Sequence, residues 1–176
     1  MVDLKSPLAL EFSPYGALTH EQLTVLEQHY HLLLRWNQKI NLTRITSLQQ
    51  AVRFHYCESL YLASRLPEGP LRIIDVGSGA GFPGIPVAIY RPECTVDLVE
   101  SHKRKSVFLR EAARDLKNIR VLSGRAEEVS DSYDWMISRA VSPADVLELK
   151  LAPHVAVLGS EGERLPWGEK RALFIR

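Results

Sequence analysis

The chain has 176 residues, of which 45% are hydrophobic, enough for one domain with a core and a small appendage. Its formal net charge of +1 excludes a global electrostatic field that would recruit nucleic acid. Cys57 and Cys94 lie outside any CxxC pattern that would indicate a metal site. No apolar run is long enough to span a membrane, and the charges among the first residues are not typical of a signal peptide. We therefore expect a reduced, cytoplasmic protein without a metal, a signal peptide or a membrane contact.

The N-terminal part is expected to be helical. Capping-box patterns at Thr19 and Ser47 each open a segment, and the apolar spacing carries these two helices to about Trp36 and Leu66. A tetrapeptide with two prolines and a glycine then interrupts the chain. This pattern predicts a helical cap over residues 1–66 that precedes the rest of the fold.

Beyond residue 66, short apolar runs alternate with amphipathic segments, which is typical of a parallel sheet with crossover helices. Together with the cap, residues 67–176 are expected to form one compact α/β unit. The expected strands are 71–76, 95–99, 119–122, 135–138, 154–158 and 171–175, and the expected helices are 83–90, 103–116 and 143–151.

A glycine-rich loop follows the first strand. Gly77, Gly79 and Gly81 stand at alternate positions, and glycine lets a backbone take positive φ and approach a ligand closely. Glu100 ends the next strand about 20 residues later, where a carboxylate can accept both hydroxyls of a ribose. The order strand, glycine loop, helix, strand and acid predicts a site for a nucleoside cofactor.

The spacing of this loop distinguishes between two cofactors. A dinucleotide loop reads G-x-G-x-x-G, but Phe82 occupies the position of its third glycine. Asp75, just before the loop, would repel a pyrophosphate and suits an ammonium group. S-adenosylmethionine carries an ammonium and a sulfonium and no phosphate, so the pattern favours it over NAD and resembles motif I of class I methyltransferases. The remaining alternative is an ordinary strand–turn–helix without a ligand.

Basic residues are concentrated after Glu100. Eight basic and two acidic residues lie between Lys103 and Arg125. A solvated helix face and phosphate contacts with RNA are both compatible with this run. Because they follow strands that end at the cofactor site, the candidate RNA-binding residues are Lys103, Arg104, Lys105 and Arg125.

Taken together, the motifs resemble the bacterial 16S ribosomal RNA guanine-N7 methyltransferases, the RsmG or GidB family. The resemblance covers most of residues 20–142. It implies a class I (Rossmann-like) methyltransferase sheet with an N-terminal helical cap, and methyl transfer from S-adenosylmethionine to N7 of a guanine in 16S rRNA. The matching residues are Trp36–Thr43, His55, Glu58–Leu60, Asp75–Pro86, Glu100–Ser101, Lys105, Phe108–Leu109, Gly124–Glu127 and Ser138–Ala140.

The resemblance also implies roles for single residues. Arg139, after the fourth strand, would be the catalytic residue at the methyl-donor end of the crevice. From the residues alone, Phe82 could instead belong to the core, Glu127 could be a helix-start acid, and Arg139 could be half of a structural ion pair. The partner would be 16S rRNA or the 30S subunit, and the protein would act as a monomer. The cofactor-binding residues would be Asp75, Gly77, Gly79, Phe82, Glu100, Ala126, Glu127 and Arg139.

The expected chemistry needs no general base, because guanine N7 is a lone pair without a proton. In agreement, no Ser/His/Asp arrangement is visible, and catalysis would depend on holding the base in line with the methyl group. Arg139 could hydrogen-bond to the guanine or stack on it. His55 could line the pocket or be structural.

The C-terminal end departs from the family pattern. The segment after the fifth strand is shorter, a lysine that usually follows that strand is absent, and Glu58 stands where the family more often has Asp. These departures leave open a second interpretation, a ribosome-associated RNA-binding protein without turnover. A third, an NAD-dependent oxidoreductase, is disfavoured by Phe82 and Asp75.

Overall fold

The computed structural model describes residues 2–176. Its centre is a seven-stranded sheet with the order β3-β2-β1-β4-β5-β7-β6. Strands β3 to β5 are parallel, whereas β7 is antiparallel to both of its neighbours. The strands are β1 (Arg72–Val76), β2 (Thr95–Glu100), β3 (Ile119–Ser123), β4 (Trp135–Arg139), β5 (His154–Gly159), β6 (Glu163–Arg164) and β7 (Ala172–Ile175).

This topology confirms the predicted Rossmann-like α/β sheet and shows that it is doubly wound. The chain runs outward from β1 through β2 to β3, and then returns to build β4 and β5 on the other side of β1. The direction of winding therefore changes between β1 and β4. Ligands of open α/β sheets bind outside the carboxyl ends of the strands at such a switch point.

Nine helical segments surround the sheet. In the described residues they are α1 (Lys5–Phe12), α2 (His20–Asn37), α3 (Leu48–Ala51), the π-helical turn η1 (Val52–Cys57), α4 (Glu58–Arg65), α5 (Gly84–Tyr90), α6 (Lys103–Ala112), the 3₁₀ turn η2 (Ala126–Glu128) and α7 (Pro143–Glu148). The predicted start of α2 is confirmed. The Thr19 hydroxyl accepts the Gln22 N–H at 3.1 Å, and the Gln22 side chain accepts the Thr19 N–H at 2.9 Å.

Several predicted boundaries were wrong. The second cap helix is not uniform, because η1 divides it into α3 and α4. The predicted helix 103–116 ends as α6 at Ala112, and the predicted helix 143–151 ends as α7 at Glu148, shortly before Lys150, which has φ +53°. Three elements were not predicted, the short turn η2 among them. Helix α1 buries Leu8 and Phe12 at a helical spacing, and β6 is too short to leave a periodic pattern.

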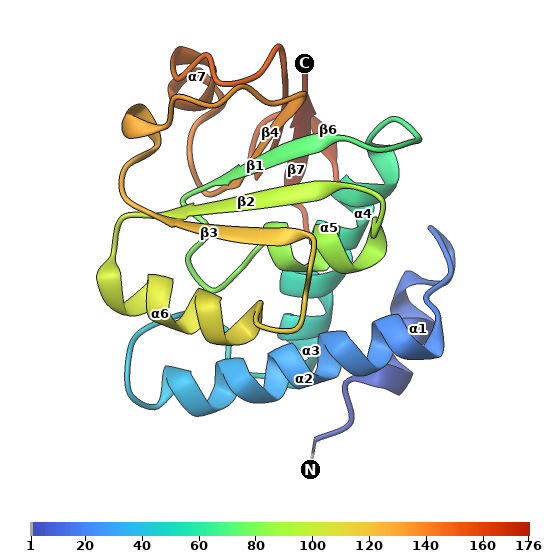
Figure 1. Cartoon of the computed structure of the whole chain (residues 1–176). Coiled ribbons are helices and arrows are strands. Elements are labelled where there is room, and N and C mark those ends of the chain that lie inside the picture. Colours follow the sequence, from blue (N-terminus) through green and yellow to red (C-terminus); the bar gives the residue numbers. More distant parts are fainter. Residues whose placement is uncertain (1) are drawn as a thin grey trace.

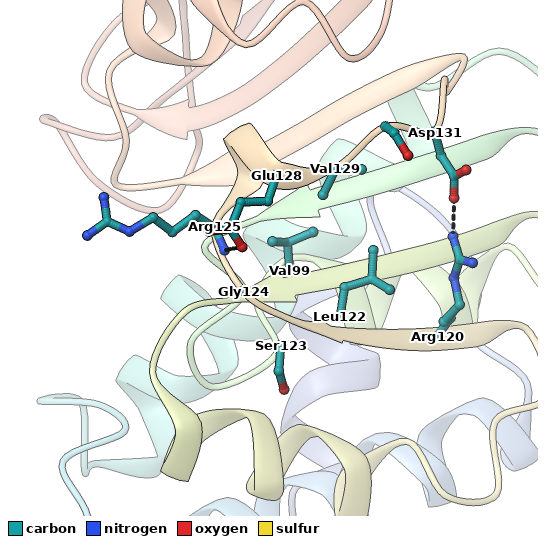
Figure 2. A pocket seen from close by; sticks show the side chains of 10 residues that line it. Val99, Arg120, Leu122, Ser123, Gly124, Arg125, Glu128, Val129 and Asp131 are labelled. Atoms are coloured by element: carbon teal, nitrogen blue, oxygen red, sulfur yellow. Dashed lines mark hydrogen bonds and ion pairs between the residues drawn. The ribbon is translucent and has the colours of Figure 1, made fainter.

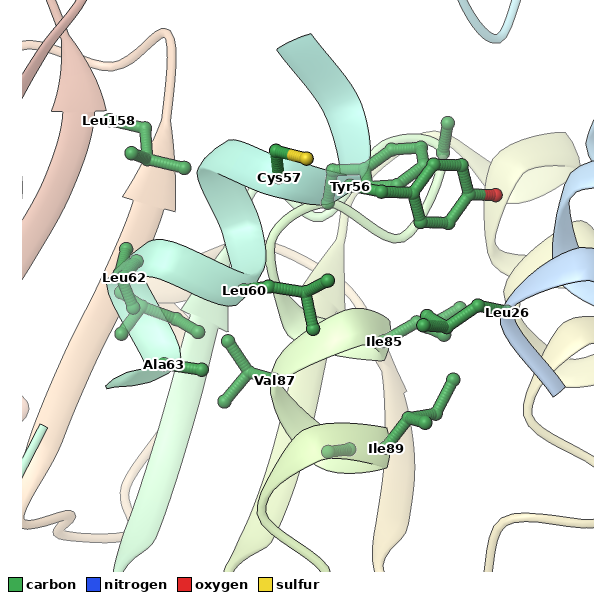
Figure 3. Close-up of a cluster of buried hydrophobic side chains, with 14 of the residues drawn as sticks. Leu26, Tyr56, Cys57, Leu60, Leu62, Ala63, Ile85, Val87, Ile89 and Leu158 are labelled. Atoms are coloured by element: carbon green, nitrogen blue, oxygen red, sulfur yellow. The ribbon is translucent and has the colours of Figure 1, made fainter. Parts of the chain in front are cut away.

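Helices α1 to α6 lie on one face of the sheet and α7 on the other (Figure 1). The first face carries most of the core. Figure 3 shows Leu26 of α2, Leu60 of α4 and Ile85 of α5 within one buried cluster, and all three are fully buried. The cap thus shares its hydrophobic core with the α/β sheet. The division into residues 1–66 and 67–176 within one compact unit stays a prediction.

An ion pair also joins the cap to the far edge of the sheet. The Glu58 side chain on α4 is 1% exposed, and its Oε1 accepts a hydrogen bond from Arg171 Nε at 2.7 Å. Its Oε2 accepts a second bond from Arg171 Nη2. Arg171 directly precedes β7, so this bidentate pair ties α4 to the C-terminal strands.

Replacing Glu58 with alanine is expected to lower the free energy of unfolding by about 2–3 kcal/mol, because two charge-assisted hydrogen bonds to the partly exposed Arg171 are lost. The matched control is Glu163→Ala, which breaks the exposed Arg65–Glu163 pair and should cost less than about 1 kcal/mol. Urea titrations measure both values, and equal losses would contradict the prediction. If the cap and sheet form one unit, the fluorescence and far-UV circular dichroism transitions will also coincide.

Candidate cofactor and methyl-transfer site

The glycine loop takes the conformation that its sequence predicts. Gly77, Gly79 and Gly81 have φ of +72°, +57° and +87°, where other residues are strained. The N–H groups of Gly77 and Ser78 both donate to Val99 O at 3.0 Å, so the loop lies over the end of β2. A side chain at Gly77 would meet no atom within 4 Å, which leaves this backbone open to a ligand.

Glu100 holds the same loop from the end of β2. Its carboxylate, 7% exposed, accepts hydrogen bonds from Gly79 N and from His102 N, each at 2.8 Å. Each carboxylate oxygen has a further lone pair, so Glu100 can still accept the hydroxyls of a ribose. The structure therefore places the predicted ribose acid directly against the predicted glycine loop.

Asp75 is fully buried beneath the loop. Its Oδ2 accepts the Gly84 N–H at 2.9 Å, whereas its Oδ1 is the one buried side-chain nitrogen or oxygen in residues 2–176 without a hydrogen-bond partner. Burial raises the pKa of Asp75 to about 7, against the lowering effect of the Gly84 N–H. An unpaired acceptor here fits a ligand that brings a positively charged donor.

A crevice of about 650 Å³ opens at the switch point. Three predicted cofactor-binding residues, Gly77, Ala126 and Glu127, line it together with Arg125, which was predicted to bind RNA. The other predicted cofactor-binding residues do not line it: Asp75, Gly79, Phe82, Glu100 and Arg139. Ala126 is buried, whereas Glu127 is exposed at the rim. The other residues that line the crevice are Val76, Val99, Ser101, His102, Gly124, Glu128, Val141, Asp145 and Leu149.

A smaller hollow of about 260 Å³ adjoins the crevice between β2, β3 and the segment after η2 (Figure 2). Its outer end is closed by an ion pair at 2.6 Å between Arg120 and Asp131, and Arg120 also binds Asp97 on β2. At its inner end, the Arg125 N–H donates to Glu128 Oε2 at 3.3 Å. These contacts fix the loop after β3, which carries Ala126 and Glu127. The Arg125 side chain itself points outward and is exposed.

Arg139, at the end of β4, is held by the cap rather than by an acid. Its Nη1 donates to Phe54 O at 3.1 Å and to His55 Nδ1 at 2.6 Å. Its guanidinium lies 4.9 Å from the centre of the Phe82 ring. Among residues 2–176 Arg139 forms no ion pair, so the alternative of a structural ion pair is wrong. Burial lowers the pKa of Arg139 to about 10, which leaves the group charged at neutral pH.

Phe82 takes the core position, one of the two roles that the sequence left open. It is 1% exposed and belongs to the main core cluster. It also packs against the cap, since the His55 ring stacks on it at 4.4 Å with an interplanar angle of 10°. Its contact with a cofactor stays a prediction.

Residues 22–161 match a known family, GidB, described as rRNA small subunit methyltransferase G. The chain belongs to this family. It is 40% identical over 142 residues to the ribosomal RNA small subunit methyltransferase G of Caldanaerobacter subterraneus subsp. tengcongensis, covering 76% of this chain and 59% of that relative. It is 39% identical over 142 residues to the protein of the same name from Chromobacterium violaceum, covering 78% and 67%. The alignments thus span only about 59–67% of these two relatives.

The fold comparison agrees with the family match. The crystal structure of a precorrin-6y C5,15-methyltransferase from Geobacter metallireducens superposes with a TM-score of 0.51 at 15% identity, covering 71% of this chain and 70% of that one. At this identity the similarity concerns the fold alone. It confirms that the GidB-family chain has the Rossmann-like methyltransferase sheet predicted from its sequence.

In this GidB-family chain the predicted RNA-binding residues lie beside the crevice. Lys103, Arg104 and Lys105 form the first turn of α6, directly after His102, which lines the crevice. Lys103 and Arg104 are exposed, and Lys105 is half-buried. None of these three side chains takes part in an ion pair within the described part of the chain, so no carboxylate there neutralises their charges.

One residue that supports the glycine loop was not predicted from the sequence. His29 of α2 lies under the glycine loop, where its Nε2 is 3.1 Å from Ala80 O and its Nδ1 is 2.9 Å from the Tyr56 hydroxyl. Burial lowers the pKa of His29 to about 4, so the ring is neutral at pH 7. The signal available in the sequence was a histidine on the apolar face of a helix, which is not specific.

Two further findings concern residues 2–176 alone. No helix there has both the length and the apolar character of a membrane span. No group of three or more His, Cys, Asp or Glu side chains there has an arrangement that could hold a metal ion.

Proposed function

We propose that this GidB-family chain transfers a methyl group from S-adenosylmethionine to N7 of a guanine in 16S rRNA. It would act in the cytoplasm as a monomer, on the free rRNA or on the 30S subunit. The observation that carries the proposal is the convergence of Asp75, Glu100 and Arg139 at the switch point of a methyltransferase sheet. The names of the relatives, ribosomal RNA small subunit methyltransferase G, support the substrate class.

The residues present fit S-adenosylmethionine, which supplies an electrophilic methyl group when bound. Glu100 would accept the ribose hydroxyls, and the open backbone at Gly77 would allow close approach. Ala126 and Glu127 would flank the adenosine at the end of β3. The unpaired Oδ1 of Asp75 would receive the ammonium group. A pyrophosphate has no such fit, because the buried carboxylate of Asp75 would repel it.

The chain's task in the reaction is to orient and hold the base. Because N7 carries no proton, no side chain has to remove one. Within residues 2–176, Nε and Nη2 of Arg139 make no hydrogen bonds, so the guanidinium can donate to O6 of the guanine or stack on its ring. The base would enter the crevice from an unpaired or flipped state, as in other enzymes that modify nucleic-acid bases.

The alternative without turnover rested on the shortened C-terminal end. In the structure β5 is followed directly by β6 and β7, and β7 completes the sheet beside β5. The glycine loop follows β1, Glu100 ends β2 and Arg139 ends β4, so none of them belongs to this segment. Nothing in the described residues favours a non-enzymatic protein over an enzyme.

The test is transfer of radiolabelled methyl from S-adenosylmethionine to 30S subunits that lack the modification. Subunits that already carry it serve as the negative control, and free 16S rRNA is assayed in parallel to identify the form of the substrate. Calorimetry with S-adenosylhomocysteine measures cofactor binding separately. Label at N7 of one guanine is expected. Cofactor binding without label on either RNA would refute the proposed reaction.

Replacing Lys103, Arg104 and Lys105 together with alanine is expected to weaken rRNA binding at least about tenfold. If each side chain contacts one phosphate, the slope of log K against log salt concentration should fall by about 2–3. The affinity for S-adenosylhomocysteine should not change. The control variant removes the same charge elsewhere, by Arg164→Ala, Lys170→Ala and Arg176→Ala. An equal loss in both variants would show that only the total charge matters.

A further inference from the structure

Arg139 is oriented by two acceptors from the same turn of the cap, Phe54 O and His55 Nδ1. A guanidinium has only donors, so the His55 Nδ1 that it contacts must carry the lone pair. The proton of the neutral ring then sits on Nε2, which donates to the Thr43 hydroxyl at 2.8 Å. The contact with Arg139 thus fixes the tautomer of His55, and the Thr43 hydroxyl, which can donate or accept, accepts the Nε2–H in that tautomer.

Thr43 is itself fixed by the cap. Asn37 Oδ1 accepts the Thr43 N–H at 2.9 Å, and Asn37 Nδ2 donates to Thr43 O at 3.0 Å. The Thr43 hydroxyl also accepts the Ile45 N–H at 3.0 Å. A continuous chain of hydrogen bonds therefore runs from the end of α2 through Thr43 and His55 to Arg139.

Packing fixes the plane of the His55 ring. The ring is 2% exposed and stacks on Phe82 of the glycine loop, and the Arg139 guanidinium lies over the same Phe82 ring at 4.9 Å. Stacking on one face and hydrogen bonds at both nitrogens leave the imidazole one orientation. The π-helical turn η1 that carries His55 is itself an irregularity of the kind that often occurs at functional sites.

The charges around this cluster leave Arg139 available to a ligand. Glu58, on the next turn of the cap, is engaged by Arg171 through both carboxylate oxygens. Burial, and then the charge of Arg139, lower the pKa of His55 to about 2, so His55 remains a neutral acceptor. Arg139 is therefore oriented without being neutralised, and its Nε and Nη2 keep their donors.

We propose that His55, with its tautomer set by Arg139 and its Nε2–H held by Thr43, is a positioning residue that fixes the guanidinium of Arg139 for the guanine. This inference rests on the proposed function, and it makes the helical cap a part of the methyl-transfer site. The tautomer and the order of Arg139 can be measured without any turnover, so the two proposals can fail separately.

The first test compares His55→Asn with His55→Gln. Asparagine can place an amide oxygen near the position of Nδ1, where Arg139 needs an acceptor, whereas glutamine reaches the position of Nε2 and leaves Arg139 without one. We expect kcat for 30S methylation to fall about 100-fold in His55→Gln and less than about tenfold in His55→Asn. Both variants lose the stacking on Phe82, so a merely structural role predicts equal losses of kcat and would overturn the proposal.

The second test uses ¹⁵N NMR. In the unmodified protein His55 should be the Nε2–H tautomer and should not titrate between pH 5 and 8. The Nε–H group of Arg139 should become mobile in His55→Gln but stay ordered in His55→Asn. Thr43→Val should keep the Nε2–H tautomer, because Arg139 still needs the lone pair on Nδ1, but should shift the Nε2 resonance, and Thr43→Ser should restore its position. A titrating or Nδ1–H His55, or an equally ordered Arg139 in both His55 variants, would overturn the proposal even if no methyl transfer is found.

Discussion

Replacing Arg139 with alanine is expected to reduce methyl transfer to 30S subunits by about 10²–10³-fold, the loss that follows removal of one preorganised donor at a reacting group. The guanidinium is the cationic group that the structure orients at the end of β4 without a carboxylate partner. Without it, the base would lose the donor that fixes its approach to the methyl group. The measurement is the single-turnover rate with saturating S-adenosylmethionine.

Arg139→Lys separates charge from geometry. Lysine keeps the positive charge, but its ammonium is a single point charge without the planar fork of arginine. It cannot contact Phe54 O and His55 Nδ1 and at the same time cover the Phe82 ring and offer further donors to the base. We expect at least about a tenfold loss for this variant. Arg164→Ala, which removes an exposed arginine from β6, should keep the rate of the unmodified protein.

Protein folding must be checked beside these rates. Arg139→Ala leaves two acceptors of η1 without their donor, which should cost about 1–2 kcal/mol of stability. That is too little to unfold the chain. A folded Arg139→Ala variant with an unchanged single-turnover rate would remove Arg139 from the mechanism.

Asp75→Asn is expected to weaken binding of S-adenosylhomocysteine about 10- to 100-fold. The buried Oδ1 of Asp75 has no partner in the protein, and a hydrogen bond from a cationic donor to a carboxylate contributes about 1.5–3 kcal/mol. Asparagine keeps an oxygen for the Gly84 N–H but presents an amide N–H₂ to the ligand's ammonium group. Asp115→Asn, at a side chain that is 91% exposed, is the control and should not change the affinity.

The same variant tests the protonation of Asp75. Burial raises its pKa from 3.8 to about 7 in the folded protein, so between these values the folded state binds the proton more tightly than the unfolded state does. The stabilising contribution of this proton is complete below pH 4 and is lost as the pH rises towards 7. The free energy of unfolding of the unmodified protein, minus that of Asp75→Asn, should therefore fall with rising pH across this window.

The difference between the two proteins is the quantity to measure, because His29 acts in the opposite direction. Burial lowers the pKa of His29 to about 4, so its contribution to stability grows as the pH rises from 4 to about 6.5. The contribution of His29 is the same in both proteins and cancels. A difference that stays flat from pH 4 to pH 7 would show that Asp75 is ionised throughout.

Cofactor binding should be linked to the same proton. If the ammonium group meets Asp75, binding near pH 6 releases a proton from the carboxyl group, and calorimetry in buffers of different ionisation enthalpy detects it. Asp75→Asn should show no such release. Equal affinity and equal proton release in both proteins would contradict the assignment of Asp75 to the ammonium group.

Local interactions explain what could be predicted from the sequence. The capping box at Thr19, the positive φ of Gly77 and the length of the parallel strands each depend on residues within a few positions of one another. Glu100 was assigned to the ribose because a strand that ends after a glycine loop brings its last residue to the same edge of the sheet. The roles of Asp75, Arg139 and the basic residues of α6 stay predictions until the variants are measured.

The sequence by itself determined the strands, the glycine loop and the residues that end the strands, because periodicity, caps and glycine conformations are local. Only the tertiary structure decided what holds those residues. Arg139 meets His55 across 84 positions, and Glu58 meets Arg171 across 113. Contacts at such separations depend on how the cap packs onto the shared core, and no short pattern in the chain specifies that packing.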